Sequence, residues 1–123
     1  KLAEHAPLQL KIAETAAEID AAQALIVADL EEINVTGIAG GTLDRMQRVR
    51  FKRDVAFAAQ LCRRAVDRLF TAAGGAGIML SNAQQRRFRD IHAISGHIAL
   101  NWDVAGTTFG RVAFGLDTGA ALI

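Results

Sequence analysis

Two histidines near the C-terminal end of the chain are the residues best suited to acid–base chemistry. His92 and His97 are five residues apart, which puts them about 140° apart on a regular helix. Two histidines that bind zinc from one face of a helix are separated by four residues, so the spacing argues against a metal site. On spacing alone, both histidines are interpreted as packing or capping residues.

Two glycine clusters and a run of basic residues could also bind ligands. The clusters cover residues 37–41 and 74–77. Neither follows a strand or has the spacing of a phosphate-binding or dinucleotide-binding loop, so helix ends explain them better. The basic residues between Arg45 and Arg53 have an acidic segment of the same chain as a partner, which argues against nucleic-acid binding.

Composition indicates one domain. The chain has 123 residues, of which 51% are hydrophobic, with a single proline and a formal net charge of +1. This length suffices for one hydrophobic core, and the balanced charge favours neither nucleic acid nor an anionic membrane. Apolar runs stop short of the roughly 20 residues that span a bilayer. The single cysteine, Cys62, cannot form an internal disulfide, and we expect a buried thiol in a cytoplasmic protein.

The elements that position these residues are predicted to be helices, two long and one or two short, in an all-α up-and-down bundle. Alanine-rich and leucine-rich sequence predicts the first helix over residues 8–35, after a proline suited to a first turn. Its apolar residues recur at spacings of three and four, which predicts a seam that faces other helices. The seam comprises Ile12, Ala16, Ile19, Gln23, Ile26, Leu30 and Ile33.

A glycine-rich connector over residues 36–41 should end the first helix, and Thr42 is the expected N-cap of the second, which runs to about Ala73. The predicted apolar stripe of this second helix comprises Leu43, Met46, Val49, Val55, Ala58, Cys62, Ala65 and Leu69.

The C-terminal third of the chain should hold the shorter helices. Ser81 and Asn82 are capping residues for a third helix from Gln84 to about Leu100, which a break near residues 95–96 could divide. Asp103 is the expected cap of a fourth helix that ends at Phe114. No alternating strand pattern or internal repeat is found in the sequence.

The two long segments carry opposite charges. Residues 8–35 hold one basic and six acidic side chains, a net charge of −5, and residues 42–73 hold eight basic and three acidic ones, a net charge of +5. A short connector makes such helices antiparallel neighbours. Exposed ion pairs contribute only about 0–1 kcal/mol each, so we expect the charges to select pairing and register more than stability.

Arg89-Asp90-x-His92-Ala93-x-x-x-His97 is followed by Asn101-Trp102-Asp103, then by a Gly106–Arg111 segment and Phe114-Gly115-Leu116. This pattern resembles the C-terminal signature of the two-component aromatic monooxygenases that use reduced flavin, such as the oxygenase components of p-hydroxyphenylacetate hydroxylases. The order of two long helices, Gly74-Gly75-Ala76-Gly77 and the Arg-Asp pair is also similar to the C-terminal bundle of acyl-CoA dehydrogenases.

The resemblance implies a function and a catalytic residue. It implies hydroxylation of an aromatic or polycyclic substrate by a flavin C4a-hydroperoxide, with FMNH2 or FADH2 delivered by a separate flavin reductase. It also places His97 over the flavin and substrate, where the imidazole could accept a phenol proton or bind the hydroperoxide. His92, Trp102 and Asp103 lie nearby without an assigned role, and no residue is assigned to flavin binding.

The resemblance also implies that residues 1–123 are a single C-terminal domain of a larger enzyme. The flavin would be bound mainly by N-terminal helical and middle β-domains outside this chain, so we expect the chain alone to be inactive. An apolar flank should be covered by those domains or by another copy, and the family's tetramer makes a homo-oligomer the expected state.

Two departures from acyl-CoA dehydrogenases bear on the alternatives. Many of those enzymes have a catalytic glutamate soon after the Arg-Asp pair, whereas no carboxylate lies between Asp90 and Asp103 here. They often have a glutamine before the paired glycines that helps to hold the adenine end of FAD, and Thr71 in this chain fits FMN better. An acyl-CoA dehydrogenase domain and a non-catalytic helical oligomerisation module remain as alternatives.

Overall fold

The computed structural model describes residues 4–118, and its regular structure is entirely helical. The remaining residues of the predicted domain, 1–3 and 119–123, lie outside this description. The helices in chain order are α1 (Ala6–Ile38), α2 (Arg45–Ala72), α3 (Ala83–Ser95) and α4 (Trp102–Ala113). Short 3-10 turns, η2 (Gly74–Ile78) and η3 (Ile98–Leu100), precede α3 and α4 respectively. The predicted all-α fold with two long helices is confirmed.

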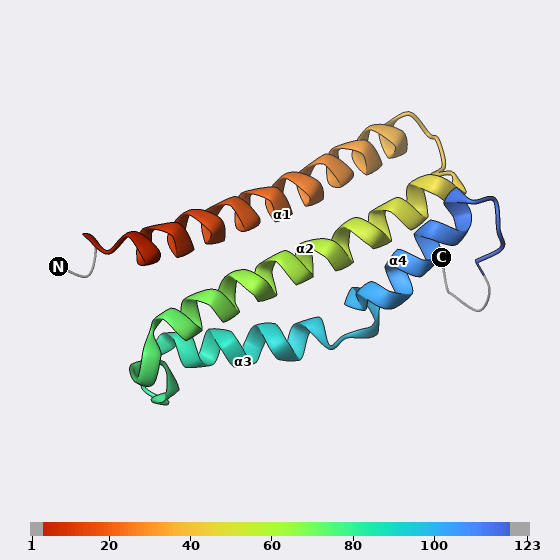
Figure 1. The fold of residues 1–123 in the computed structure, drawn as a ribbon. Coiled ribbons are helices and arrows are strands. Elements are labelled where there is room, and N and C mark those ends of the chain that lie inside the picture. The colour runs from red at the N-terminus through yellow and green to blue at the C-terminus, as the bar shows by residue number, and fades with distance from the viewer. Residues whose placement is uncertain (1–3, 119–123) are drawn as a thin grey trace.

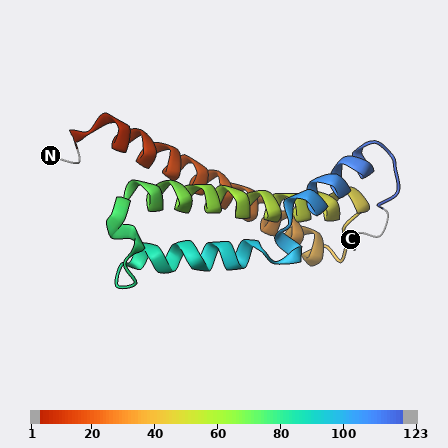
Figure 2. The same ribbon diagram turned by 60° about the horizontal axis from the view of Figure 1, so that its bottom comes forward.

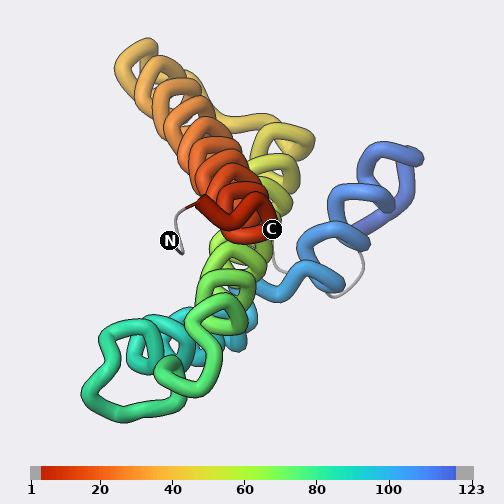
Figure 3. The backbone as a smooth tube through the Cα atoms, turned by 60° about the vertical axis from the view of Figure 1, so that its left-hand side comes forward, coloured from red at the N-terminus to blue at the C-terminus, as the bar shows by residue number. Residues whose placement is uncertain are grey.

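Helix α2 is the centre of the fold and contacts each of the other three α-helices. Figure 1 shows α1 running antiparallel along one side of α2, with α3 and α4 on the other side. Figure 2 shows that α3 follows the C-terminal half of α2 and that α4 follows the N-terminal half. In Figure 3, the tube view, α1 lies away from both short helices. One face of α1 is therefore left without a helical neighbour among the described residues.

Side-chain caps set where the helices begin. Helix α2 begins after Asp44 in a capping box: Gln47 N–H donates to the Asp44 carboxylate at 2.7 Å, and Asp44 N–H donates to the Gln47 side chain at 2.8 Å. The predicted cap, Thr42, was therefore wrong by two residues. Asp44 is the cap because its carboxylate and the side chain of the glutamine three residues later each accept a hydrogen bond from a backbone N–H group.

The other caps follow the same rule. Asn82 caps α3 as predicted, because its side chain accepts from Gln84 N–H at 2.9 Å. Helix α4 is capped by Asn101, which accepts from Val104 N–H at 3.1 Å. The prediction that Asp103 caps this helix was wrong, since Asp103 lies in the first helical turn. A carboxylate there still interacts favourably with the positive end of the helix dipole.

Two helix ends also differ from the prediction. Helix α1 continues to Ile38, three residues beyond the predicted end, and Gly40 then adopts a positive φ of 69°. Helix α3 ends at Ser95, so the break considered near residues 95–96 is present. The segment after Gly96 forms the η3 turn instead of continuing the helix to Leu100.

The face of α1 that contacts α2 is not the predicted apolar seam. The buried residues of α1 are Thr15, Ala22 and Asp29, which lie seven residues apart on one stripe. Most of the predicted seam is exposed, and Ile12 and Leu30 keep 51% and 58% of their accessible surface. The seam was predicted to face other helices, and within residues 4–118 only its Ile26 packs against the core cluster. The face that contacts α2 instead carries acidic residues that pair with arginines of α2.

Ion pairs join the two long helices. Arg68 pairs with Glu18 at 2.7 Å and with Glu14 at 3.0 Å, and Arg64 pairs with Glu18 at 3.1 Å. Arg50 pairs with Glu32 near the other end of the helices. The hydrogen bond from Arg68 lowers the pKa of Glu18 below its usual range. The predicted antiparallel, charge-complementary pairing is thus confirmed.

The core between the helices is small and rich in alanine. One cluster consists of Ala22, Ala58 and Leu61, with Leu25, Ile26, Phe57 and Cys62 packed around it. Burial raises the pKa of the Cys62 thiol, which is half-buried. No helix that the structure describes, within residues 4–118, is long and apolar enough to cross a membrane.

The α2 stripe was predicted only in part. Val49, Ala58 and Ala65 are buried, whereas Met46 and Val55 are exposed. The prediction missed three further buried apolar residues because α2 packs on two opposite sides, against α1 and against the short helices. These residues are Phe51, Ala56 and Leu61.

Candidate functional site

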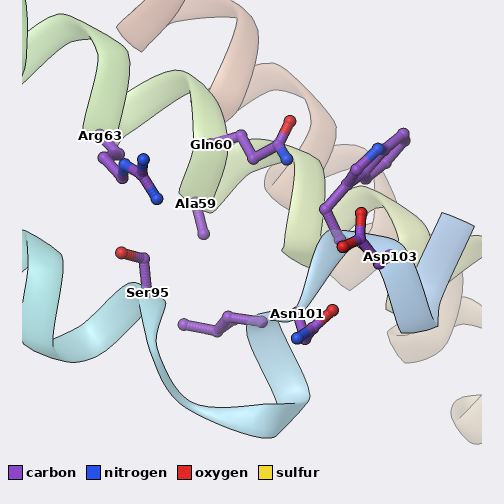
Figure 4. Close-up of a pocket in the computed structure, with 8 residues that line it drawn as sticks. Ala59, Gln60, Arg63, Ser95, Asn101 and Asp103 are labelled. Atoms are coloured by element: carbon purple, nitrogen blue, oxygen red, sulfur yellow. The ribbon is translucent and has the colours of Figure 1, made fainter.

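The junction between α3 and α4 forms a pocket against α2. Its volume is about 190 Å³, and its polar lining comprises Gln60, Arg63, Ser95, Asn101, Trp102 and Asp103. Figure 4 shows that Gln60 and Arg63 come from α2, Ser95 from the end of α3, and Asn101 and Asp103 from the start of α4. The break at residues 95–96 therefore builds this pocket, because it turns the chain across α2 before α4 begins.

Polar groups in the pocket are partly held by the fold. Ser95 Oγ donates to the carbonyl of His92 at 3.4 Å, and Asn101 is occupied as the cap of α4. Arg63 makes a long contact of 3.8 Å to Asp67 one turn away, and its side chain is 54% exposed. A guanidinium so weakly held can still bind an anion or a phenol oxygen.

His97 is not among the residues that line this pocket, and it lies beyond the end of α3. Its side chain is exposed, and Nδ1 accepts a hydrogen bond from Ala99 N–H at 3.1 Å as the cap of η3. With Nδ1 accepting, the proton of the neutral imidazole is on Nε2, which is then a donor. The helical spacing argument for the two histidines does not apply, because His92 and His97 do not share one helix.

His92 is anchored between α3 and α2. Its Nδ1–H donates to the carbonyl of Phe88 at 2.8 Å, and its Nε2 lies 3.4 Å from Asp67 Oδ1. The imidazole lies 4.2 Å from the Phe88 ring, which stacks at 4.3 Å on Phe70. These contacts hold α3 against the C-terminal half of α2, and His92 is half-buried in them.

Trp102, the first residue of α4, borders three neighbouring pockets. Besides the polar pocket, it lines a hollow of about 290 Å³ with Leu25 and Phe57, and another of about 510 Å³ with Gly106 and Phe109. Its ring lies 5.4 Å from the Phe57 ring at an interplanar angle of 48°. The sequence left Trp102 without a role, because contact with Phe57 cannot be inferred from spacing along the chain.

Arg53 is a second residue to which the sequence assigned no individual role. It binds Asp54 Oδ1 through Nε at 2.7 Å and through Nη2 at 2.6 Å, and its guanidinium lies 4.3 Å from the centre of the Phe109 ring. It lines both hollows beside Trp102. Only its place among eight basic residues of one helix was visible in the sequence.

Asp29 carries a buried charge with incomplete pairing. Asp29 is 6% exposed and Asp54, on the facing helix, is 4% exposed. Asp29 Oδ2 is buried and has no hydrogen-bond partner among the described residues. Burial, followed by the nearby charge of Asp54, raises the pKa of Asp29 above its usual range.

The lining of the polar pocket has the groups that orient a planar ligand. Gln60, Arg63 and Asp103 supply donors and acceptors, and Trp102 supplies an aromatic side chain, which are the groups that ligand pockets use to orient a planar molecule. The pocket is smaller than the roughly 300–1,000 Å³ typical of a whole ligand site. Residues 4–118 contain no group of three histidine, cysteine or acidic side chains arranged to hold a metal ion.

Comparisons with known proteins match this architecture. The sequence pattern of the acyl-CoA dehydrogenase C-terminal domain matches residues 1–102. The oxygenase component of an FADH2-dependent resorcinol hydroxylase from Rhizobium sp. (strain MTP-10005) is 36% identical over 95% of this chain and 30% of its own length. The oxygenase component of p-hydroxyphenylacetate 3-hydroxylase from Acinetobacter baumannii is 29% identical over 95% of this chain and 28% of its own length.

A solved structure agrees with these relatives. XiaF from Streptomyces sp., in complex with FADH2 and glycerol, superposes with a TM-score of 0.93 at 27% identity, covering 98% of this chain and 31% of its own. The chain thus spans only about 30% of the length of the proteins it matches. The chain belongs to the acyl-CoA dehydrogenase C-terminal domain family, and its homologues are oxygenase components of two-component flavin-dependent monooxygenases.

Proposed function

We propose that this chain is the C-terminal bundle of an oxygenase component that hydroxylates a small aromatic substrate with reduced flavin. The observation that carries the proposal is the 36% identity to a resorcinol hydroxylase component over nearly the whole chain. The proposal includes N-terminal helical and middle β-domains in the full-length protein, since the matched relatives are about three times as long. The isolated 123 residues are expected to have no activity.

The proposed cofactor is FADH2, supplied by a separate flavin reductase. Two relatives support FADH2 over FMNH2, because one is named for its dependence on it and another was solved with it. This outweighs the preference for FMN that Thr71 suggested. When bound, the reduced flavin supplies the two electrons that place one atom of O2 on the aromatic carbon and the other in water.

His97 is proposed as the catalytic residue, acting as a hydrogen-bond donor more than as a base. The hydrogen bond from Ala99 N–H to Nδ1 supports this role. It occupies the lone pair that a base would use, and it leaves Nε2–H as the group that can donate to a ligand. A donor in a site closed from water stabilises charge that develops on oxygen. His92 is the contrasting residue, since both of its ring nitrogens face acceptors within the fold.

The test compares three variants of the full-length oxygenase, supplied with reduced FAD and a phenol. His97→Ala should lower the rate of hydroxylation by about 10²–10³-fold, the usual cost of removing such a donor, while oxygen is still reduced to hydrogen peroxide. His97→Gln retains an N–H near the position of Nε2 and should recover part of this loss. His92→Ala should lower the thermal stability of the protein, with only a small effect on the coupled product yield.

Three results would contradict the proposal at different points. Equal product yields for the wild type and His97→Ala would remove the catalytic role. A glutamine variant as inactive as the alanine variant would indicate a base instead of a donor. Oxidation of acyl-CoA thioesters without hydroxylation of any phenol would replace the whole function with that of a dehydrogenase.

We also propose a homo-oligomer, with a tetramer as the expected state. The exposed apolar residues of α1 support this, because a stripe that includes Ile12, Ile19 and Leu30 is typical of a surface covered by another subunit or domain.

A further inference from the structure

We propose that Trp102 contacts the aromatic ring of the substrate and limits which rings the site accepts. The inference rests on the proposed function and goes beyond it by naming a specificity-determining residue. Trp102 lines all three cavities: the polar pocket, the hollow that contains Phe57 and the hollow that contains Phe109. A molecule that enters any of the three meets the indole.

The indole is held in one place by two contacts. Phe57 of α2 packs against it with ring centres 5.4 Å apart. On α4 itself, Gly106 leaves room for the ring: a Cβ at Gly106 would lie 3.3 Å from Cε2 and 3.4 Å from Cζ2 of Trp102. The indole therefore lies along the first turn of α4, over Gly106, where a Cβ would require it to shift by a few tenths of an ångström.

The chemistry around the indole suits a phenol. An aromatic ring binds another ring in an offset or edge-to-face arrangement, with centres about 4.5–7 Å apart. The polar pocket places Gln60, Arg63 and Asp103 beside Trp102, so a hydroxyl substituent can form hydrogen bonds while the ring rests on the indole. The ligand class is thus a hydroxylated aromatic molecule, whose size is limited by the position of the indole.

A purely structural role makes a different prediction. If Trp102 served only to pack α4 on α2, its loss would lower stability without changing the preference for substrates. Trp102 is only half-buried, and its ring borders open pockets, so much of its surface is available to a ligand. The two roles are separable by comparing kinetics with stability in the same variants.

The experiment uses the full-length oxygenase with reduced FAD, and with phenol, resorcinol and 1-naphthol as probes. Trp102→Leu should raise KM for the one-ring phenols about tenfold with a smaller change in kcat, because stacking binds ground state and transition state alike. Trp102→Phe should recover most of the affinity. Gly106→Ala, which requires the indole to shift by a few tenths of an ångström, should change the relative kcat/KM of one-ring and two-ring phenols.

Gly110→Ala is the matched control. Gly110 lies one turn further along α4, and a Cβ there meets nothing within 4 Å. The substitution has the same chemistry as Gly106→Ala, so it should leave every kinetic constant unchanged. A difference between the two glycine variants then isolates the contact with Trp102 from any effect of alanine on the helix.

The outcomes separate this inference from the function on which it rests. A wild-type enzyme that hydroxylates none of the probes would refute the proposed function and the inference together. An active wild type whose Trp102→Leu variant keeps the same KM values would refute only the inference. If Trp102→Leu does not fold, unchanged preferences in both Trp102→Phe and Gly106→Ala refute the inference equally.

Discussion

Replacing Asp29 with asparagine should stabilise the chain at neutral pH. Asparagine has nearly the same shape as aspartate and removes a charge that is 6% exposed, lies near the buried carboxylate of Asp54, and has one oxygen without a hydrogen-bond partner among the described residues. A buried group left unpaired costs about 1–3 kcal/mol. Attraction from Arg50 and Arg53 offsets part of this cost, so we expect a gain of about 1 kcal/mol.

The gain should depend on pH in a defined direction. The pKa of Asp29 is raised above its ordinary value of 3.8, so the folded state binds the proton more tightly than the unfolded state. The contribution of Asp29 to the stability of the wild type therefore falls as pH rises from about 4 through the raised pKa. The Asp29→Asn variant has no proton to lose at this position, and the difference between variant and wild type should be small below about pH 4 and largest near pH 7.

The assay is urea unfolding of the 123-residue chain, followed by circular dichroism between about pH 4 and pH 7. Asp20→Asn is the matched control, because Asp20 lies on the same helix and is exposed, so its stability should change by less than about 0.5 kcal/mol. Asp54→Asn should be destabilising, since it breaks the ion pair with Arg53. A variant at position 29 that is less stable than the wild type at neutral pH would refute the reasoning, because it would mean that the carboxylate is fully paired.

Three further predictions concern helix pairing, capping and association. Glu18→Gln should destabilise the chain by about 1 kcal/mol in urea unfolding at neutral pH. Because the pKa of Glu18 is lowered from 4.5, its contribution is complete above that pH and lost as pH falls through the lowered value, and an equal deficit at about pH 2 and at neutral pH would contradict this. Asp44→Ala should cost about 1 kcal/mol by removing a cap, whereas Thr42→Ala should cost almost nothing by the same measurement. Light scattering should find the isolated chain associated, and a monodisperse monomer would show that the α1 stripe tolerates water.

Local sequence information predicted much of this fold. Apolar residues that recur every three or four positions, together with the scarcity of proline, predicted the helices, because helix formation depends mainly on near neighbours along the chain. The opposite charges of the two long segments predicted their pairing, which ion pairs such as Arg68 with Glu18 confirm. The run from Arg89 to Asp103 was specific enough to indicate the family that the comparisons then showed.

Cap residues were harder to choose, since several polar side chains precede each helix. Thr42 and Asp44 are both suitable by type, and only the backbone geometry decides which one reaches the N–H of the third helical residue. The same holds for Asn101 and Asp103 at the start of α4. An error of two residues is small for the fold, and at α4 both Asn101 and Asp103 line the polar pocket.

The tertiary structure alone decided which face of α1 is buried and which residues form the pockets. Hydrophobic spacing identifies a stripe, but the stripe that contacts α2 depends on the side chains of α2, whose Arg64 and Arg68 pair with Glu18. Trp102 meets Phe57, 45 residues away, only because the break after Ser95 carries the chain across α2. Such contacts depend on the relative placement of distant segments, which no pattern within a single segment contains.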